Sequence, residues 1–371
     1  MLIALLIIGI LILYYLQQFI FGRIWDKGLS LELKFGEDYI FEGKNGHLYE
    51  TLVNNKFLPM IAVSVRIAVS RFLIFSGHSE ANSGVSDMSY KRDIFTLMPR
   101  QQIRRTLTFK ALKRGFYHID SADLKAHDYL FIKSYFKTCD ADTAIYVYPA
   151  QLDISSVRIL NNALSGTLLT QNIINPDPFA FSSIRQYNRG DNIRFMNWKA
   201  SGKVGQYMVN KYDSTTELSV MIYLDLQDDH IFKSEYLTEE AVRIAASLVS
   251  MCLDGMLRVQ LVSNAGLIIS SEGDHTNIHD WMRKISCVDP SVARRPIAET
   301  IKDHPAPSAC ASILISKNLN EENIKAFSSD KTNRGEALWI CPHGLYDSAP
   351  AIDDKRISLL PWKVDPNKKT V

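Results

Sequence analysis

The sequence predicts a multidomain protein in which one N-terminal transmembrane helix precedes a β-sandwich and then an α/β domain with a mostly parallel sheet. Three observations predict this order. An uncharged apolar run fills residues 2–21, and apolar and polar residues alternate with a period of two from Leu29 to about Pro149. After Glu217, strand-like and helix-like segments alternate. With 371 residues, the chain is long enough for two domains and an additional segment.

The apolar run predicts a membrane anchor over residues 1–25, with residues 2–21 in the lipid bilayer. Twenty helical residues extend about 30 Å, which is the thickness of the hydrocarbon core. No Lys or Arg precedes the run and no small-residue cleavage site follows it, so an uncleaved anchor is favoured over a signal peptide. Because Arg23 and Lys27 follow the span, we expect a single-pass protein of the cell membrane whose body is cytoplasmic.

Cysteine content and charge agree with a cytoplasmic body that does not bind nucleic acid. The five cysteines are scattered and include no C-x-x-C pair, which argues against a disulfide framework and a structural zinc site. The formal net charge of +2 gives no overall attraction to nucleic acid.

Four segments follow the anchor. Short strand-like runs separated by turn-like sequences predict an immunoglobulin-like β-sandwich over residues 28–149. A connecting segment is expected over residues 150–216, the α/β domain over 217–345 and a frayed C-terminal tail over 346–371. The nearly continuous apolar run of residues 217–226 is typical of a strand that a parallel sheet buries on both faces.

The connecting segment contains a strongly basic stretch. Between residues 185 and 211 the sequence has one acid, Asp191, and six basic residues, which are Arg185, Arg189, Arg194, Lys199, Lys203 and Lys211. Asp191 is expected to cap a helix of two to three turns that Gly202 ends in a left-handed conformation.

Three explanations compete for this stretch. It is a structural clasp in which Trp198 is buried at the junction of the flanking domains, or a docking face for an acidic partner protein, or a nucleic-acid site built from alternating basic and aromatic residues. An anionic small ligand is a fourth, minor alternative. The clasp is favoured, and membrane attachment argues against nucleic acid.

The order R-x-Y-x-x-G-D-x-x-R-x-x-x-W-K-A resembles the signature of the prokaryotic "domain of unknown function 58" family. Its residues here are Arg185, Tyr187, Gly190, Asp191, Arg194, Trp198, Lys199 and Ala200. The resemblance implies a membrane anchor, a β-rich segment containing an RGFY element (Arg114–Tyr117 here) and a von Willebrand factor A-like α/β domain. It also implies a MoxR-type AAA+ ATPase as partner. Such proteins often begin with two membrane spans, whereas this chain has one.

A von Willebrand factor A domain that binds Mg²⁺ does so through an Asp-x-Ser-x-Ser loop after its first strand. Asp225, Gln227 and Asp229 occupy those positions here, so both serines are missing. Lys317 follows a later strand where relatives usually have an acid, and its ammonium group would repel a divalent cation. The expectation is a degenerate metal site with no resident cofactor, and weak Mg²⁺ or Ca²⁺ binding at most.

No nucleotide-binding loop, nucleophile elbow or zinc-protease motif is present in the sequence. We therefore expect a membrane-anchored, non-enzymatic adaptor or scaffold that binds a MoxR-type ATPase or its clients during assembly or maturation of protein complexes. The alternative is a divalent-metal-dependent hydrolase with its site at Asp225, Asp228 and Asp229.

Overall fold

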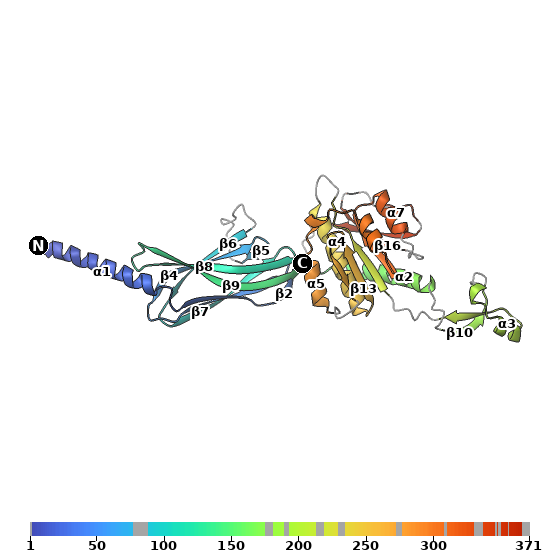
Figure 1. Ribbon diagram of the computed structural model, residues 1–371, viewed down its shortest axis with the longest axis horizontal. Helices are drawn as coiled ribbons and strands as arrows, with labels where there is room; N and C mark the ends of the chain where they lie inside the picture. Colours follow the sequence, from blue (N-terminus) through green and yellow to red (C-terminus); the bar gives the residue numbers. More distant parts are fainter. Residues whose placement is uncertain are drawn as a thin grey trace. The chain divides into compact units, whose positions relative to one another are not determined.

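The chain of the computed structural model divides into two compact units, and the division falls between Ala150 and Gln151 in the sequence (Figure 1). The structure describes residues 2–76, 88–174, 181–188, 193–212, 219–228, 234–271, 277–307, 310–329, 337–345, 347, 350–354 and 356–365.

The first unit begins with helix α1, Leu2–Ile24. Its residues Leu6–Ile24 form one helix that is long and apolar enough to cross a membrane, which supports the predicted span. The C-terminal end of this helix packs on the domain that follows. Phe21 is 1% exposed, and its ring centroid lies 5.5 Å from that of Tyr129 and 5.4 Å from that of Tyr135.

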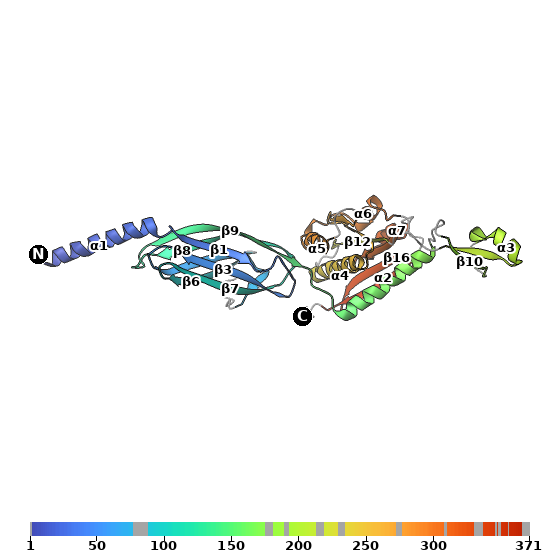
Figure 2. The same cartoon turned by 90° about the horizontal axis from the view of Figure 1, so that it is seen from below.

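Two sheets form a β-sandwich after α1 (Figure 2), which confirms the predicted β-rich domain. One sheet has the strand order β1-β3-β7-β5, and the other has the order β2-β9-β8-β4-β6. Neighbouring strands run antiparallel, except that β2 and β9 run parallel. The strands are β1 (Leu29–Phe35), β2 (Tyr39–Phe41), β3 (Asn45–Asn54), β4 (Met60–Ser70), β5 (Leu73–Phe75), β6 (Met88–Leu97), β7 (Gln101–Ala111), β8 (Gly115–His127) and β9 (Ser134–Tyr148).

The alternating sequence creates the core of the sandwich. Every second residue of β1 is buried, from Leu29 to Phe35, while the residues between them are exposed. Leu48 and Leu52 of β3 and Val65 of β4 bring the two sheets into one apolar cluster. A shift of one residue in register would expose this whole set, so the hydrophobic pattern fixes the pairing.

Glu50 of β3 is an acid inside this sandwich, being 1% exposed. Burial, and secondarily the charge of Asp93, raise its pKa from 4.5 to about 7, although Arg105 and Lys91 act in the opposite direction. Because the pKa of Glu50 is higher in the folded state, the folded protein binds a proton more tightly than the unfolded chain does. The resulting contribution to the free energy of unfolding is complete below about pH 4.5 and is lost as the pH rises through 7.

Glu50→Gln is therefore expected to raise the free energy of unfolding at pH 8 by about 3 kcal/mol and to flatten its decline between pH 5 and pH 8. Chemical denaturation at the two pH values measures both effects. Glu32→Gln, on an exposed position of β1, is the matched control and should change little. A decline that persists in the Glu50 variant would contradict the assignment.

The second unit is built on a sheet with the strand order β14-β13-β12-β15-β16-β17. All neighbouring strands run parallel except the edge strand β14, which runs antiparallel to β13. The sheet is therefore mixed, and the prediction of a mostly parallel sheet is confirmed in part. The strands are β12 (Ser219–Leu224), β13 (Arg258–Ser263), β14 (Ile268–Ser270), β15 (Cys310–Ile315), β16 (Ala337–Gly344) and β17 (Ile357–Val364). The chain order reverses at β12, which defines a switch point.

Helices cover both faces of this sheet (Figure 2). Helices α2 and α4 contact each other and share contacts with β15 and β16, while α6 and α7 contact each other. Met221 and Tyr223 of β12 pack with Ile301 of α6 and Phe327 of α7. The helices are α2 (Ile154–Ile174), α4 (Glu235–Asp254), α5 (Ile278–Ser286), α6 (Ile297–Asp303), α7 (Glu321–Ser329) and the short 3₁₀ helix η3 (Pro290–Val292).

Two predicted boundaries are wrong. Residues 154–174 belong to α2 instead of a connecting segment, because Leu160 and Leu164 are buried at helical spacing and Asp153 accepts a hydrogen bond from the Ser156 amide (3.1 Å) at the helix start. Residues 357–364 form strand β17 instead of a frayed tail. Pro361 obscured this strand in the sequence, but an edge strand accommodates a residue that lacks an amide hydrogen.

Candidate functional site

The basic stretch folds into a small module of two strands and a short helix, called the Trp198 module below (β10 to β11, residues 181–212). Strand β10 (Phe181–Gln186) pairs antiparallel with β11 (Met208–Tyr212), so that Arg185 lies opposite Val209. Between the strands lie the 3₁₀ helix η2 (Ile193–Phe195) and helix α3 (Trp198–Val204). The predicted single helix is thus divided in two. Gly202 lies inside α3, and the left-handed cap is Gly205, with φ of 71°.

Asn197 and Ser201 hold α3 against β11. The side-chain oxygen of Asn197 accepts a hydrogen bond from the Ala200 amide (2.9 Å), and its amide group donates to Asn210 Oδ1 (2.7 Å). Ser201 Oγ donates to the Asn197 carbonyl (2.7 Å) and accepts from the Met208 amide (2.9 Å). Polar side chains, more than a hydrophobic core, therefore fix the shape of this module.

Trp198 faces solvent, and 67% of its surface is exposed. The predicted burial of this side chain at a junction of the flanking domains stays a prediction. The polar contacts of Asn197 and Ser201 satisfy α3 without it. Ile193, Val204 and Tyr207 are also exposed, by 66%, 58% and 63%. Large apolar groups left in water on a structured surface are typical of a protein-binding face.

The cations of the motif share this exposure. Arg185, Arg194, Lys199 and Lys203 are all exposed. Tyr187 is half-buried, and its ring lies 6.5 Å from that of Tyr207 in an edge-to-face arrangement. Gly190 and Asp191, together with the predicted capping role of Asp191, lie outside the described residues.

The second candidate site lies at the carboxyl edge of the parallel sheet. Asp225, Asn264 and Ser316 are each the first residue after a strand, namely β12, β13 and β15. Asp225 is 4% exposed. This position beside the switch point is where open α/β sheets bind ligands.

Four hydrogen-bond donors surround the carboxylate of Asp225. Oδ1 accepts from Asn264 Nδ2 (2.7 Å) and from the Gln227 amide (3.0 Å), and Oδ2 accepts from Ser316 Oγ (2.6 Å) and Asn318 Nδ2 (3.1 Å). Burial raises the pKa of Asp225, and these four hydrogen bonds oppose that rise. The carboxylate is therefore the centre of a satisfied polar network.

Lys317 pairs with the neighbouring acid of this edge. Its Nζ lies 2.8 Å from Asp228 Oδ2, and the two side chains are 7% and 11% exposed. Asp228 Oδ2 also accepts a hydrogen bond from the Ser234 amide (2.7 Å). The ammonium group of Lys317 thus lies where a metal ion bound to the Asp228 carboxylate would have to lie.

The side chains that the structure describes at this edge do not fit a divalent metal ion. Mg²⁺ and Ca²⁺ require oxygen ligands with free lone pairs, whereas Asp225 accepts four hydrogen bonds and Asp228 is paired with Lys317. Gln227 contributes its backbone groups to the network, its carbonyl accepting from Asn318 Nδ2 (2.9 Å). Asp229, the third predicted ligand, lies outside the described residues.

A family comparison covers both candidate sites. Residues 183–334 match the model of a family described as a protein of unknown function, DUF58. The match supports the DUF58 family. It spans the chain from β10 to the residues before β16, and so includes the Trp198 module and Asp225. No curated protein matches this DUF58-like chain.

Two of the similar solved structures each cover about a third of the chain. The CARDB domain of a Pyrococcus furiosus protein in complex with di-metal ions is 14% identical, with 32% of this chain and 94% of that chain covered at a TM-score of 0.19. A PapD-like domain of human CEP192 is 12% identical, with 32% and 84% covered at a TM-score of 0.20. Likeness at these scores carries no argument about function.

Sequence reasoning missed the residues that organise both sites. Asn197 was detectable as a helix cap, because asparagine is favoured there and Trp-Lys-Ala follows it. Asn264 and Asn318 come within three residues of the ends of β13 and β15, and a polar residue at a strand's carboxyl end was the available signal.

Proposed function

We propose that this chain is a membrane-anchored, non-enzymatic adaptor that binds an acidic protein partner through the Trp198 module. The observation that carries the proposal is the exposed indole of Trp198, which stands among exposed cations on a hydrogen-bonded scaffold. Tryptophan, tyrosine and arginine are the side chains that most often dominate binding energy at protein interfaces.

The rigidity of the module supports binding. Asn197 and Ser201 connect α3 to β11 before any partner arrives, so little conformational entropy is lost on association. Lys199 and Lys203 lie one turn apart on α3 and add a positive field that accelerates encounter with an acidic surface.

For the partner we propose a MoxR-type AAA+ ATPase or one of its clients, on the basis of the family resemblance. The body would be cytoplasmic, and the α/β unit would be von Willebrand factor A-like. Its strand order with one antiparallel edge strand and its alternating helices support that assignment. The assembly would act in the maturation of other protein complexes.

Co-purification of the full chain in detergent with a MoxR-type AAA+ ATPase from the same organism tests this proposal. The double variant Lys199→Glu/Lys203→Glu is expected to lower the recovered ATPase at least tenfold, because it reverses the charge of the docking face. Lys302→Glu, on an exposed position of α6, is the matched control and should bind normally. Absence of the ATPase from the wild-type complex, or equal loss in both variants, would refute the proposal.

A divalent-metal-dependent hydrolase is the second candidate. The position of Asp225 beside the switch point favours it. The four donors on that carboxylate and the Lys317–Asp228 pair argue against it, and metal binding that depends on Asp225 would decide between the two functions.

A further inference from the structure

The tip of the β8–β9 hairpin exposes consecutive apolar side chains. Leu130, Phe131 and Ile132 are 56%, 55% and 64% exposed. Hairpin turns are ordinarily built from glycine, asparagine, aspartate and other polar residues, because they lie in water. Three large apolar residues at such a tip therefore need an apolar environment that the sandwich itself does not provide.

The tip is held in one conformation. Asp128 Oδ1 accepts hydrogen bonds from the amides of Ile132 (2.8 Å) and Lys133 (3.1 Å), and the Asp128 carbonyl accepts from the Phe131 amide (3.0 Å). Phe131 has a φ of 56°, a left-handed conformation that glycine or asparagine adopts more readily. The Phe131 ring stacks on that of His127 at a centroid distance of 5.5 Å and is still 55% exposed. A phenylalanine held at this strained position carries an energetic cost, which favours a functional role.

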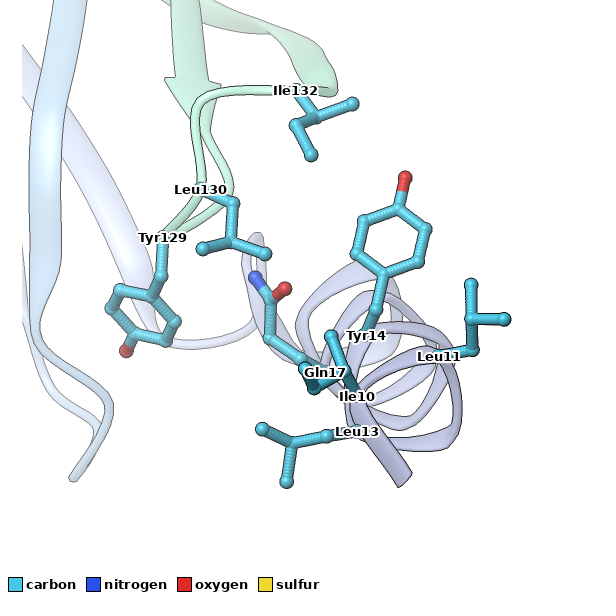
Figure 3. Close-up of a pocket in the computed structure, with 8 residues that line it drawn as sticks. All are labelled: Ile10, Leu11, Leu13, Tyr14, Gln17, Tyr129, Leu130 and Ile132. Carbon is cyan, nitrogen blue, oxygen red and sulfur yellow. The ribbon is translucent and has the colours of Figure 1, made fainter. Parts of the chain in front are cut away.

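The tip lies beside helix α1. Tyr129, Leu130 and Ile132 line an open hollow of about 560 Å³ together with Ile10, Tyr14 and Gln17 of the helix (Figure 3). The ring contacts of Phe21 with Tyr129 and Tyr135 hold the helix to this end of the sandwich. Lys56 Nζ donates to the carbonyl groups of Ile24 and Trp25 at the end of the helix.

The residues of α1 that lie beside the hairpin tip indicate how deep in the bilayer the tip lies. Tyr14 and the exposed Arg23 are nine residues apart, or about 14 Å along a helix. With Arg23 at the level of the headgroups, residues beside Tyr14 lie within the hydrocarbon core, which is about 30 Å thick. The apolar tip is thus at the level of acyl chains, in continuity with the predicted span.

Basic side chains flank the apolar tip at this end of the sandwich. Lys133 directly follows it, Arg23 lies near the helix end, and both are exposed. In the turn between β3 and β4, Phe57 is 75% exposed, and the Arg100 guanidinium lies 4.3 Å from its ring centroid. Apolar groups bordered by cations match a leaflet of acyl chains below anionic headgroups.

We propose that residues 129–132 insert into the same bilayer leaflet as the C-terminal half of α1, and that a phospholipid acyl chain fills the hollow between them. The hairpin is then a second membrane contact that restricts rotation of the sandwich about its anchor. The inference requires α1 to lie in a membrane, and it is independent of the Trp198 module.

Site-specific photocrosslinking of the full chain in phospholipid vesicles tests the insertion. p-Benzoylphenylalanine replaces Phe131, or Phe116 as the matched control, and mass spectrometry quantifies phospholipid adducts after irradiation. Phe116 is 49% exposed near the start of β8, about 36 Å along the strand from its end at His127. At least tenfold more lipid adduct is expected at position 131 than at position 116.

The same substitution at Ile12 of α1, which is 62% exposed, reports whether the anchor itself is in lipid. Lipid adducts at position 12 but not at position 131 would overturn the proposal, as would adducts at 131 to a second copy of the chain or to another protein. No adduct at either position would overturn it together with the anchor. If the Phe131 variant does not fold, the probe at Ile132 replaces it. Vesicles of phosphatidylcholine with and without phosphatidylglycerol separate the acyl-chain contribution from that of the anionic headgroups.

Discussion

Replacing Trp198 by alanine is expected to leave the melting temperature of the chain unchanged and to weaken partner binding about 30-fold or more. The side chain is 67% exposed, so its removal leaves no internal cavity. An exposed tryptophan at the centre of a docking face typically contributes 2 kcal/mol or more to binding, and 2 kcal/mol corresponds to a factor of about 30. Thermal unfolding and an equilibrium binding titration with the purified ATPase measure the two effects.

Trp339 provides the matched control for this prediction. It is 0% exposed in β16, and its Nε1 donates to the Ser316 carbonyl (3.0 Å). Trp339→Ala is expected to cost about 3–5 kcal/mol of stability, because it empties part of a packed core. A comparable loss of stability in the Trp198 variant would restore the clasp interpretation and contradict the docking face.

Replacing Asp225 by alanine is expected to lower the free energy of unfolding by about 3–5 kcal/mol. The change removes the charged acceptor that the donors of Asn264, Ser316 and Asn318 share inside the sheet edge, and each hydrogen bond to a charged group contributes about 1.5–3 kcal/mol. Urea denaturation at pH 7 measures the change. Asp254→Ala, on an exposed position at the end of α4, should alter stability by less than about 0.5 kcal/mol.

Calorimetric titration with Mg²⁺, Ca²⁺ and Mn²⁺ complements the stability measurement. No heat that depends on Asp225 is expected, because its carboxylate already accepts four hydrogen bonds. Tight binding that Asp225→Ala abolishes would contradict the structural role and favour the metal-dependent hydrolase.

The periodicity of the sequence predicted the sheets well. In β1, alternating residues are buried from Leu29 to Phe35, so the pattern itself specifies which face is inside. In β12 the near-continuous apolar run matches a strand covered on both faces, with Val220 to Leu224 all buried. Burial of side chains with a regular period is a property that the order of residues records directly.

The candidate sites were less predictable, because they depend on packing partners that are remote in sequence. Nothing adjacent to Trp198 in the sequence distinguishes a buried indole from an exposed one. The hydrogen bond of Asn197 to Asn210, which joins α3 to β11, links residues 13 positions apart. Asp225 was recognisable as a possible ligand, but its partner Asn318 lies 93 residues away along the chain. Helix α2 was missed because its apolar stripe is narrow and interrupted by polar residues.

The most direct test of the docking face is hydrogen–deuterium exchange of the full chain, free and in complex with its partner. The account predicts slower exchange of the amides in residues 193–209 on binding. It predicts no change in the exchange of the amides in α7, which is remote in sequence from the docking face. Unchanged exchange throughout residues 193–209 in a saturated complex, with protection confined to other segments, would contradict it.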